Sequence, residues 1–563
     1  MNYTEIANML FPDVTLTVED IEKRYPKREL PEGAKVTRFA PSPTGFVHFG
    51  GLFPSTVCER LAHQSGGVFY LRIEDTDDKR EVPGAAQALI KTLAMYGINF
   101  DEGASLDGDG NICDKGAYGP YKQSARAEIY RVYAKKLVSE GKAYPCFTTE
   151  EELEALNAQD KKTEVKSREW TAELEAQQKA EMLALRNITE EEIKEHLEKG
   201  HPFVLRMLAS GDGEKKIKVT DLVKGTLELP ENDKDEVLLK SNGIPTYHFA
   251  HAVDDHLMGT THVVRGEEWL PSLPRHLMLF NYLGFKAPKY LHIAQIMRLD
   301  EEGNKKKLSK RDMGASLDDY AKMGIAPECV REYIMTLLNS NYEEWHAQNP
   351  EKDVDDFPFS IKKMSVSGCL FDFNKLSDVS KNVICKMSAE KVYEDSAKWA
   401  EEYDKEFYNV YSKDPEYAKK ILAIGRGGNK PRKDIASWAD IKPYVSYFYD
   451  EFFTPEAVYD EKFEKADIAK ALSLYLEKFD KSFDNSAWFE SVKQVAEEIG
   501  FAPEMKLYKK NPEQYKGSVG DVSTFIRIAV TGRTNTPDLF EIIGVMGEEM
   551  MKNRINSAIA SLN

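Results

Sequence analysis

Near the start of the chain, a histidine and several glycines have the spacing of a phosphate-binding loop. Residues 36–40 predict a short buried strand, and residues 41–45 an irregular loop, because proline fixes φ and glycine permits positive φ. His48 lies at the mouth of this loop, and Gly50 and Gly51 open a helical pattern. A helix start directs backbone N–H groups and a positive dipole end at an anion. We therefore predict a nucleotide cradle, although the glycines match neither a Walker loop nor G-x-G-x-x-G.

A basic segment far downstream could neutralise the phosphates of such a nucleotide. Residues 304–311 read Asn-Lys-Lys-Lys-Leu-Ser-Lys-Arg. Lys307 and Lys310 would act there as mobile point charges on a leaving pyrophosphate, with Mg²⁺ sharing the phosphate charge. A basic run by itself is usually a solvated loop, so this interpretation depends on the first motif.

Acidic and basic side chains lie at the ends of three predicted strands, at the sheet edge where open α/β folds bind ligands. Glu74 follows the buried strand 67–73 and could pair with a substrate ammonium; the alternative is an acidic loop that caps a helix. Arg38 and Arg265 each end a strand, and arginine suits bidentate recognition of a carboxylate. A substrate with two carboxylates would use both arginines, which favours glutamate over glutamine.

Both phosphate-binding motifs resemble signatures of the class I aminoacyl-tRNA synthetases. His48-Phe49-Gly50-Gly51 resembles their H-I-G-H motif without its second histidine, and Lys307-Leu308-Ser309-Lys310-Arg311 resembles K-M-S-K-S. The strings at residues 40–45 and 72–77 look like the bacterial-type glutamyl-tRNA synthetases. Further similar segments lie at 119–124, 245–248, 253–256 and 265–269, so the resemblance covers residues 36 to at least 385 and returns more weakly near the C-terminus.

The resemblance implies a set of site residues. Those implied to contact glutamate are Arg38, Ser42, Glu74, Tyr247 and Arg265. Those implied for the ATP side are Thr44, Gly45, His48, Gly50, Gly51, Glu268, Trp269, Leu308 and Lys310, and the catalytic residues are His48, Lys307 and Lys310. A family position that can be Asn is His251 here, which leaves a ligand role and a satisfied helix-face histidine equally open. Asp254, Asp255 and His256 are consecutive and point in different directions, which argues against a metal site.

The implied activity is that of a glutamate–tRNA ligase using ATP and Mg²⁺. Its macromolecular partner would be tRNA(Glu), with tRNA(Gln) left open as a second acceptor, and the family suggests a monomer. The inserted segment would hold the acceptor end of the tRNA. The helical C-terminal half would read the anticodon, where single-stranded bases are recognised by stacking and edge hydrogen bonds. Candidate readers there, which are also candidates for the core, are Trp438, Tyr444, Phe448, Arg432 and Arg533.

Composition sets limits on these interpretations. The chain has 563 residues, enough for roughly four domains, and a net charge of −18 that argues against a generic nucleic-acid binder. Its basic side chains gather locally, at residues 305–311 and 419–433. The six cysteines include no C-x-x-C pair, so we expect no metal site in the protein and in particular no zinc. No apolar run could span a bilayer, and early acidic residues exclude an export signal, which indicates a cytoplasmic protein.

The elements that must position these residues follow from the pattern along the chain. We predict helices at 3–10 and 18–25, then alternating strands and helices typical of a parallel, doubly wound sheet, including a helix at 83–96. Residues 148–199 read as exposed helices and 201–229 as short strands, after which strands resume at 237–240, 246–250 and 262–265. The fold class is a Rossmann-like parallel sheet split by an α+β insertion, followed by an all-α C-terminal region.

Six domains follow from this division. They are a helical extension (1–34), two catalytic halves (35–145 and 237–320) around the inserted acceptor-stem-binding domain (146–236), a stem-contact helical domain (321–390) and an anticodon-binding domain (391–563). Three other functions fit the sequence less well. Glutamyl-queuosine tRNA synthetases lack the helical half, an RNA-binding scaffold has no need of His48, Lys307 and Lys310, and a cytidylyltransferase does not need a tRNA-binding half.

Overall fold

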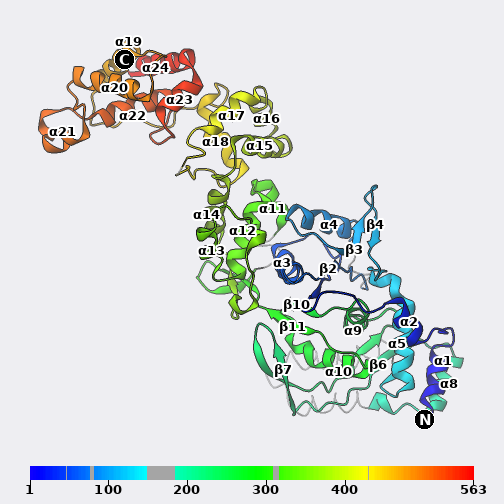
Figure 1. Ribbon diagram of the computed structural model, residues 1–563. Coiled ribbons are helices and arrows are strands. Elements are labelled where there is room, and N and C mark those ends of the chain that lie inside the picture. The colour runs from blue at the N-terminus through cyan, green and yellow to red at the C-terminus, as the bar shows by residue number, and fades with distance from the viewer. Residues whose placement is uncertain (46, 77–81, 149–183, 309–315, 429, 563) are drawn as a thin grey trace, which may run out of the picture. The chain divides into compact units, whose positions relative to one another are not determined.

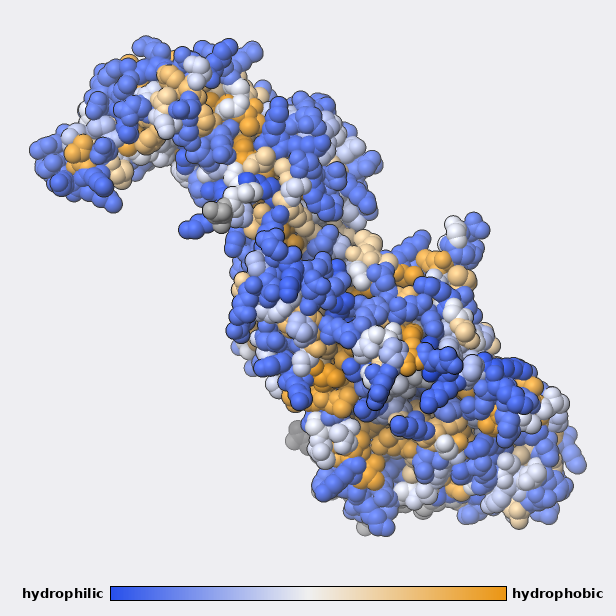
Figure 2. Space-filling view, in the orientation of Figure 1, coloured by the Kyte–Doolittle hydropathy of each residue, from blue (hydrophilic) through white to orange (hydrophobic). Residues whose placement is uncertain are grey.

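The computed structural model describes residues 1–45, 47–76, 82–148, 184–308, 316–428 and 430–562. The chain divides into two compact units, which we describe separately. The first comprises Met1–Leu317 and Ile334–Phe371, and the second Asp318–Tyr333 and Asp372–Asn563. The face shown in Figure 2 is largely hydrophilic, in keeping with a chain of which 30% is charged. None of the helices in the described ranges has both the length and the apolar character that crossing a membrane requires.

A parallel sheet forms the first part of unit 1, as the sequence predicts. β1 (Val36–Phe39), β2 (Val68–Leu71) and β3 (Glu102–Leu106) run parallel, and β4 (Ile112–Lys115) closes the edge antiparallel to β3. α3 (Phe49–His63) connects β1 to β2, and α4 (Ala85–Met95) connects β2 to β3. The predicted strands at 36–40 and 67–73 and the helix at 83–96 are therefore confirmed. The carboxyl ends of β1, β2 and β3 lie at one edge of the sheet.

The second half of the α/β fold forms another four-stranded sheet, of order β10-β11-β7-β8, beside the first. β10 (His262–Gly266) and β11 (Lys289–Ile293) are parallel, and the backbone N–H of Thr261 donates to Val36 O at 3.0 Å, so β10 begins beside β1. The insertion supplies two more strands, β7 (Lys216–Asp221) parallel to β11 and β8 (Gly225–Pro230) antiparallel to β7. Distant parts of the chain thus place two mainly parallel sheets side by side, as expected for a fold that an insertion divides.

One predicted strand is wrong. Residues 246–250 belong to a helix, α9 (Tyr247–Leu257), whose N-cap is the extended residue Thr246. The apolar residues of α9 are buried on several sides, so its sequence lacks the one-sided periodicity of a surface helix. The helix carries Tyr247, His251 and the two consecutive aspartates, and the error therefore concerns an element that positions the site.

The inserted segment also forms a small antiparallel sheet. β5 (Ala143–Cys146) pairs with β6 (Val204–Met207), which pairs with β9 (Val237–Leu239). Of the helices expected over 148–199, the structure describes α8 (Glu190–Glu198), which begins at a capping box between Thr189 and Glu192. The prediction for residues 149–183 lies outside the described residues, and the six-domain division stays a prediction.

The N-terminal extension forms the two predicted helices, α1 (Tyr3–Leu10) and α2 (Val18–Arg24). Figure 1 shows them beside α5 (Ala127–Ser139). Arg28, just after α2, donates from Nη1 and Nη2 to the carboxylate of Glu102 at 2.9 and 2.8 Å and from Nε to Met258 O at 2.8 Å. The extension is therefore an integral layer of unit 1.

The described residues of unit 2 form helices and turns. The remaining α-helices and strands of the described residues, in both units, are α10 (Leu273–Leu283), β12 (Ile296–Leu299), β13 (Lys305–Lys307), α11 (Leu317–Met323), α12 (Pro327–Leu338), α13 (Tyr342–Gln348), β14 (Cys369–Leu370), α14 (Phe373–Ile384), α15 (Ala389–Tyr403), α16 (Lys405–Tyr411), α17 (Pro415–Ala423), α18 (Ile441–Val445), α19 (Lys465–Lys478), α20 (Asn485–Glu498), α21 (Met505–Lys510), α22 (Val519–Thr531), α23 (Leu539–Met546) and α24 (Glu548–Leu562). The predicted all-α C-terminal half is confirmed.

Candidate active site

A cavity of about 980 Å³ opens at the carboxyl ends of β1 and β10. Its wall combines the loop after β1, the start of α3, the loop after β2, the first turn of α9 and the segment that follows β10. All five residues expected to contact an amino acid line it: Arg38, Ser42, Glu74, Tyr247 and Arg265. Those expected on the nucleotide side that also line it are Thr44, His48, Gly50, Glu268, Trp269, Lys307 and Leu308. Gly45 and Gly51 are not part of the wall, and Lys310 lies outside the described residues.

His48 caps the start of α3 with an extended backbone (φ −120°, ψ 167°), and its side chain is half-buried. The His48 ring lies close over the next turn, since a Cβ at Gly50 would sit 2.9 Å from its Nδ1 and 3.0 Å from its Cε1. A Cβ at Gly51 would meet Phe39 and Val47 at an ordinary 3.7 Å. Gly50 thus leaves the space that the imidazole occupies, and the positive end of the helix dipole faces the cavity.

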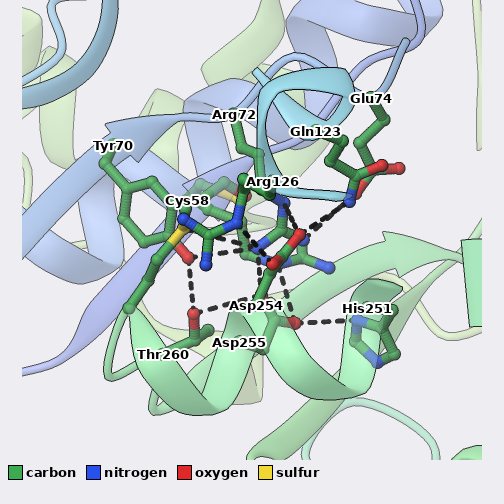
Figure 3. A network of polar contacts seen from close by, with 12 residues as sticks. Cys58, Tyr70, Arg72, Glu74, Gln123, Arg126, His251, Asp254, Asp255 and Thr260 are labelled. Carbon is green, nitrogen blue, oxygen red and sulfur yellow. Dashed lines mark hydrogen bonds and ion pairs between the residues drawn. The ribbon is translucent and has the colours of Figure 1, made fainter. Parts of the chain in front are cut away.

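Behind the cavity, buried arginines and carboxylates form a network (Figure 3). Arg38 Nε donates to both Asp255 oxygens, at 3.1 and 3.2 Å, and Arg72 Nη1 donates to Asp255 Oδ1 at 2.7 Å. Arg72 Nη2 donates to Glu74 Oε1 at 3.0 Å, and Arg126 Nε donates to Asp254 Oδ1 at 2.8 Å. Three guanidinium groups therefore face three carboxylates, which compensates the charges in a dry interior.

The network shifts the carboxylate pKa values in opposite directions. Burial opposes ionisation of Asp255, but Arg38 and Arg72 outweigh it and hold the pKa of this carboxyl well below 3.8. For Glu74, burial outweighs Arg72 and Arg38 and raises the pKa above 4.5. Among the described residues, no hydrogen bond occupies Nη1 or Nη2 of Arg38. Arg38 and Glu74 thus keep polar atoms available to a ligand in the cavity.

Asp254, Asp255 and His256 point in three directions, as expected of consecutive helical residues. Asp254 accepts from Arg126, Gln123 and Tyr130, Asp255 faces Arg38 and Arg72, and His256 Nε2 lies 2.9 Å from Glu22 Oε1. Within the described ranges, no cluster of three or more histidine, cysteine or acidic side chains could hold a metal ion. The two aspartates are therefore partners of the buried arginines, and the expected absence of zinc stays a prediction.

Arg265 is held differently from the other arginines. Its Nε donates to His292 Nε2 and its Nη1 lies against His276 Nδ1, both at 2.9 Å, while Nη2 reaches Trp269 O at 3.4 Å. Its guanidinium carbon lies 4.8 Å from the centre of the Tyr290 ring. Nη2 has the longest of the three contacts, and so is the nitrogen most readily engaged by a ligand.

His251 is fully buried and is not part of the cavity wall. Its Nδ1 lies 2.8 Å from Asp255 Oδ2 and its Nε2 lies 3.0 Å from Tyr290 OH. Burial lowers the pKa of His251 to about 4, so the ring is neutral near pH 7. These contacts favour the second of the two predicted roles, a structural histidine of the helix, although its Nδ1 lies beside Asp255 without the geometry of a hydrogen bond.

The sequence did not predict several residues of the cavity wall. Thr76, Lys240, Thr246 and Gln295 line the cavity, and Lys240 Nζ donates to Thr76 O at 2.7 Å. Gln295 Nε2 donates to Glu268 Oε2 at 3.2 Å. Lys240 directly follows a buried strand, which is the signal that singled out Arg38 and Arg265. Gln295 and Thr246 carry no comparable signal.

Residues 305–307 of the basic segment form one strand of a short hairpin at the edge of the cavity. β13 pairs antiparallel with β12, placing Lys307 opposite Met297 and Lys306 opposite Arg298. Leu308 N donates to Ile296 O at 2.9 Å, which fixes the end of the strand. Lys307 lines the cavity, whereas Lys306 pairs with Asp300 at 2.9 Å and is not part of the wall. Neighbouring lysines thus have different surroundings.

Fold and site together define an α/β protein of the class I tRNA synthetase type, since a parallel sheet presents the cavity, the H-x-G-G helix start and the basic hairpin. Comparisons agree. A family model described as the catalytic domain of class I tRNA synthetases (E and Q) matches residues 35–358, and one described as an anticodon binding domain matches residues 397–559. The chain therefore belongs to the family of class I tRNA synthetases for glutamate and glutamine.

Individual relatives match along nearly the whole chain. The glutamate–tRNA ligase of Acetivibrio thermocellus is 50% identical over 559 residues and that of Clostridium perfringens (strain 13) 47% over 560, with at least 99% of each chain covered. Among solved structures, a glutamate tRNA ligase from Elizabethkingia meningosepticum in complex with its amino acid superposes with a TM-score of 0.72 at 28% identity. This match covers 94% of the present chain and 100% of the other.

Proposed function

We propose that this protein is a glutamate–tRNA ligase. It activates L-glutamate with ATP to glutamyl-adenylate, releasing pyrophosphate, and then transfers the glutamyl group to the 3′-terminal adenosine of tRNA(Glu). The observation that carries the proposal is the cavity, whose wall combines the side chains of Arg38, Arg265 and Glu74 with the H-x-G-G helix start and the basic hairpin. The relatives at 50% and 47% identity, which carry the name glutamate–tRNA ligase, support the same activity.

For the amino acid, we assign the ammonium to Glu74 and the carboxylates to Arg38 and Arg265. Glu74 is fixed by Arg72, so its second oxygen can accept from the ammonium without rearrangement. Burial raises the pKa of the Tyr247 hydroxyl, which therefore stays a neutral donor. The centres of the Tyr247 and Trp269 rings lie 4.6 Å apart, and the two rings close one side of the cavity. Ser42 and Tyr247 complete the binding surface.

For the nucleotide, His48 and the start of α3 would hold the phosphates, while Glu268, Trp269 and Leu308 line the remaining wall. Lys307 and Lys310 would stabilise the charge that develops on the departing pyrophosphate. Mg²⁺ usually binds through substrate phosphates and one or two carboxylates. Glu268, an exposed carboxylate of the cavity wall, fits that role, and the ion would share the phosphate charge.

Unit 2 offers a surface for the tRNA anticodon. Arg432, Tyr444 and Arg533, three of the candidate readers, line a cavity of about 440 Å³ that lies wholly within this unit. The other two candidates, Trp438 and Phe448, are buried and belong to the core. Aromatic and guanidinium groups at a cavity suit the recognition of unstacked bases.

The test is aminoacylation with purified components. With tRNA(Glu), ATP and Mg²⁺, the protein should attach glutamate to tRNA and release AMP and pyrophosphate, while glutamine and aspartate should not be attached. The same assay with tRNA(Gln) measures the second acceptor included in this proposal. Charging of tRNA by another amino acid, or none with glutamate, would contradict the proposal.

A further inference from the structure

Arg265 differs from its buried neighbours in the charge of its partners. Arg38, Arg72 and Arg126 each pair with at least one carboxylate at 3.1 Å or less. Arg265 is buried like them, with 6% of its surface exposed against 0–4% for the other three, yet its partners are two imidazoles, a backbone carbonyl and an aromatic ring. Among the described residues, no carboxylate lies within ion-pair distance of Arg265. Its charge therefore lacks a direct counter-charge.

The imidazole next to Arg265 Nε must be neutral. A guanidinium nitrogen only donates, so His292 Nε2 carries no hydrogen. His292 Nδ1 lies 2.7 Å from Asp221 Oδ2 and carries the ring's single proton. Asp221 also accepts from the backbone N–H groups of His292, Val223 and Lys224. Its charge is thus shared among other donors and lies behind the ring.

The imidazole next to Nη1 belongs to a row that has no place for an extra proton. His276 Nε2 lies 2.8 Å from His248 Nδ1, and His248 Nε2 lies 3.0 Å from Arg275 Nη1. Guanidinium donors therefore stand at both ends of the row. With both rings neutral, four N–H groups point into three contacts, so at most two of the contacts can be hydrogen bonds. Protonating either ring would set N–H against N–H at a second contact. Burial also lowers the pKa of His276 well below 6.5.

We propose that His276 and His292 are positioning residues that make Arg265 selective for a carboxylate, because they fix its guanidinium as neutral acceptors and withhold a counter-charge. A buried, uncompensated cation is costly, and an anionic ligand relieves that cost where a neutral amide does not. The two histidines thereby favour glutamate over glutamine without touching either. This inference rests on the proposed function.

The test is a matched pair of variants, His276→Asn and His276→Asp. Both place an oxygen near the position of Nδ1, but only aspartate adds a negative charge next to Arg265. We expect His276→Asn to keep a glutamate KM close to that of the wild type. His276→Asp should raise it by roughly 10-fold or more relative to His276→Asn, since the new carboxylate competes with the substrate for Arg265. The KM for ATP should agree between the two variants.

Equal glutamate KM values for the Asn and Asp variants would overturn the inference. If the Asp variant does not fold, the pair His292→Gln and His292→Glu asks the same question at the other imidazole, with the same expected order. A positional role without an electrostatic part would lower activity in both members of a pair alike, which would also contradict the inference. Failure of the wild type to charge tRNA with glutamate would instead refute the proposed function.

Discussion

At the scale of single residues, the cavity distinguishes arginines by their partners. Arg38 and Arg72 share Asp255, whereas Arg265 is held by imidazoles and keeps Nη2 only weakly engaged, at 3.4 Å from Trp269 O. A guanidinium that no carboxylate neutralises is suited to recognise one. This difference supports the proposal that Arg265 binds the distal carboxylate of the substrate.

Arg265→Ala should raise the KM for glutamate by roughly 30-fold or more while the KM for ATP changes little. The reason is that losing a charge-assisted bond at a buried site costs about 2–5 kcal/mol. Steady-state aminoacylation at varied glutamate and varied ATP measures both values. Arg131→Ala, which removes the half-buried partner of the exposed Asp13, is the control and should leave both unchanged. A glutamate KM within about twofold of wild type would show that Arg265 does not bind the substrate.

The hairpin offers a second test with adjacent lysines. Lys307→Ala should lower kcat by roughly 10²–10³-fold with a smaller effect on KM, because the Lys307 ammonium would stabilise charge that develops in the transition state. Lys306→Ala should stay near wild type, since Lys306 pairs with Asp300 away from the cavity. Pyrophosphate exchange in the presence of tRNA reports the activation step. Equal losses of kcat in both variants would show that the segment acts only as a general basic patch. Lys310→Ala is expected to resemble Lys307→Ala.

At the scale of elements, α9 connects the site to the interior. Its two aspartates bind Arg126 and Arg38 respectively and both lie within ion-pair distance of Arg72, and its first turn presents Tyr247 to the cavity. Asp255→Asn would leave Arg38 and Arg72 without their shared counter-charge, at a cost of about 3–5 kcal/mol. Denaturant unfolding should register that loss. Asp13→Asn, at an ion pair whose carboxylate is 62% exposed, should cost less than about 1 kcal/mol. Similar costs for the two variants would mean that the buried network does not stabilise unit 1.

The elements were only partly predictable from the sequence. The strands of the parallel sheet were found because β-branched and aromatic residues run between turn signals, and α1 and α2 because their apolar residues recur at helical spacing. α9 was mistaken for a strand because burial on several sides removed that spacing. Arg38 and Arg265 could be inferred from their positions at strand ends. Their partners could not, because Asp255 and His276 become neighbours of these arginines only in the folded chain.

At the scale of the whole molecule, stability should fall as the pH is lowered from about 6.5 toward 4. His248 and His251 have pKa values lowered by burial from 6.5 to about 4, so the unfolded chain binds their protons first. For the fully buried His251, this amounts to roughly 3 kcal/mol once the pH is below 4. Asp255 adds a loss at still lower pH, and the raised pKa of Glu74 opposes the trend in part. Thermal midpoints across this range check the sign; a flat or rising profile would contradict it.

The central claim is that one cavity in unit 1 holds both glutamate and the nucleotide. A crystal structure with a non-hydrolysable glutamyl-adenylate analogue tests it most directly. The account predicts the distal carboxylate within about 2.7–3.2 Å of Arg265, the ammonium beside Glu74 and the adenylate against the start of α3 near His48. An analogue bound elsewhere, or one whose distal carboxylate pairs with Lys240 and leaves Arg265 with its imidazoles alone, would contradict the account.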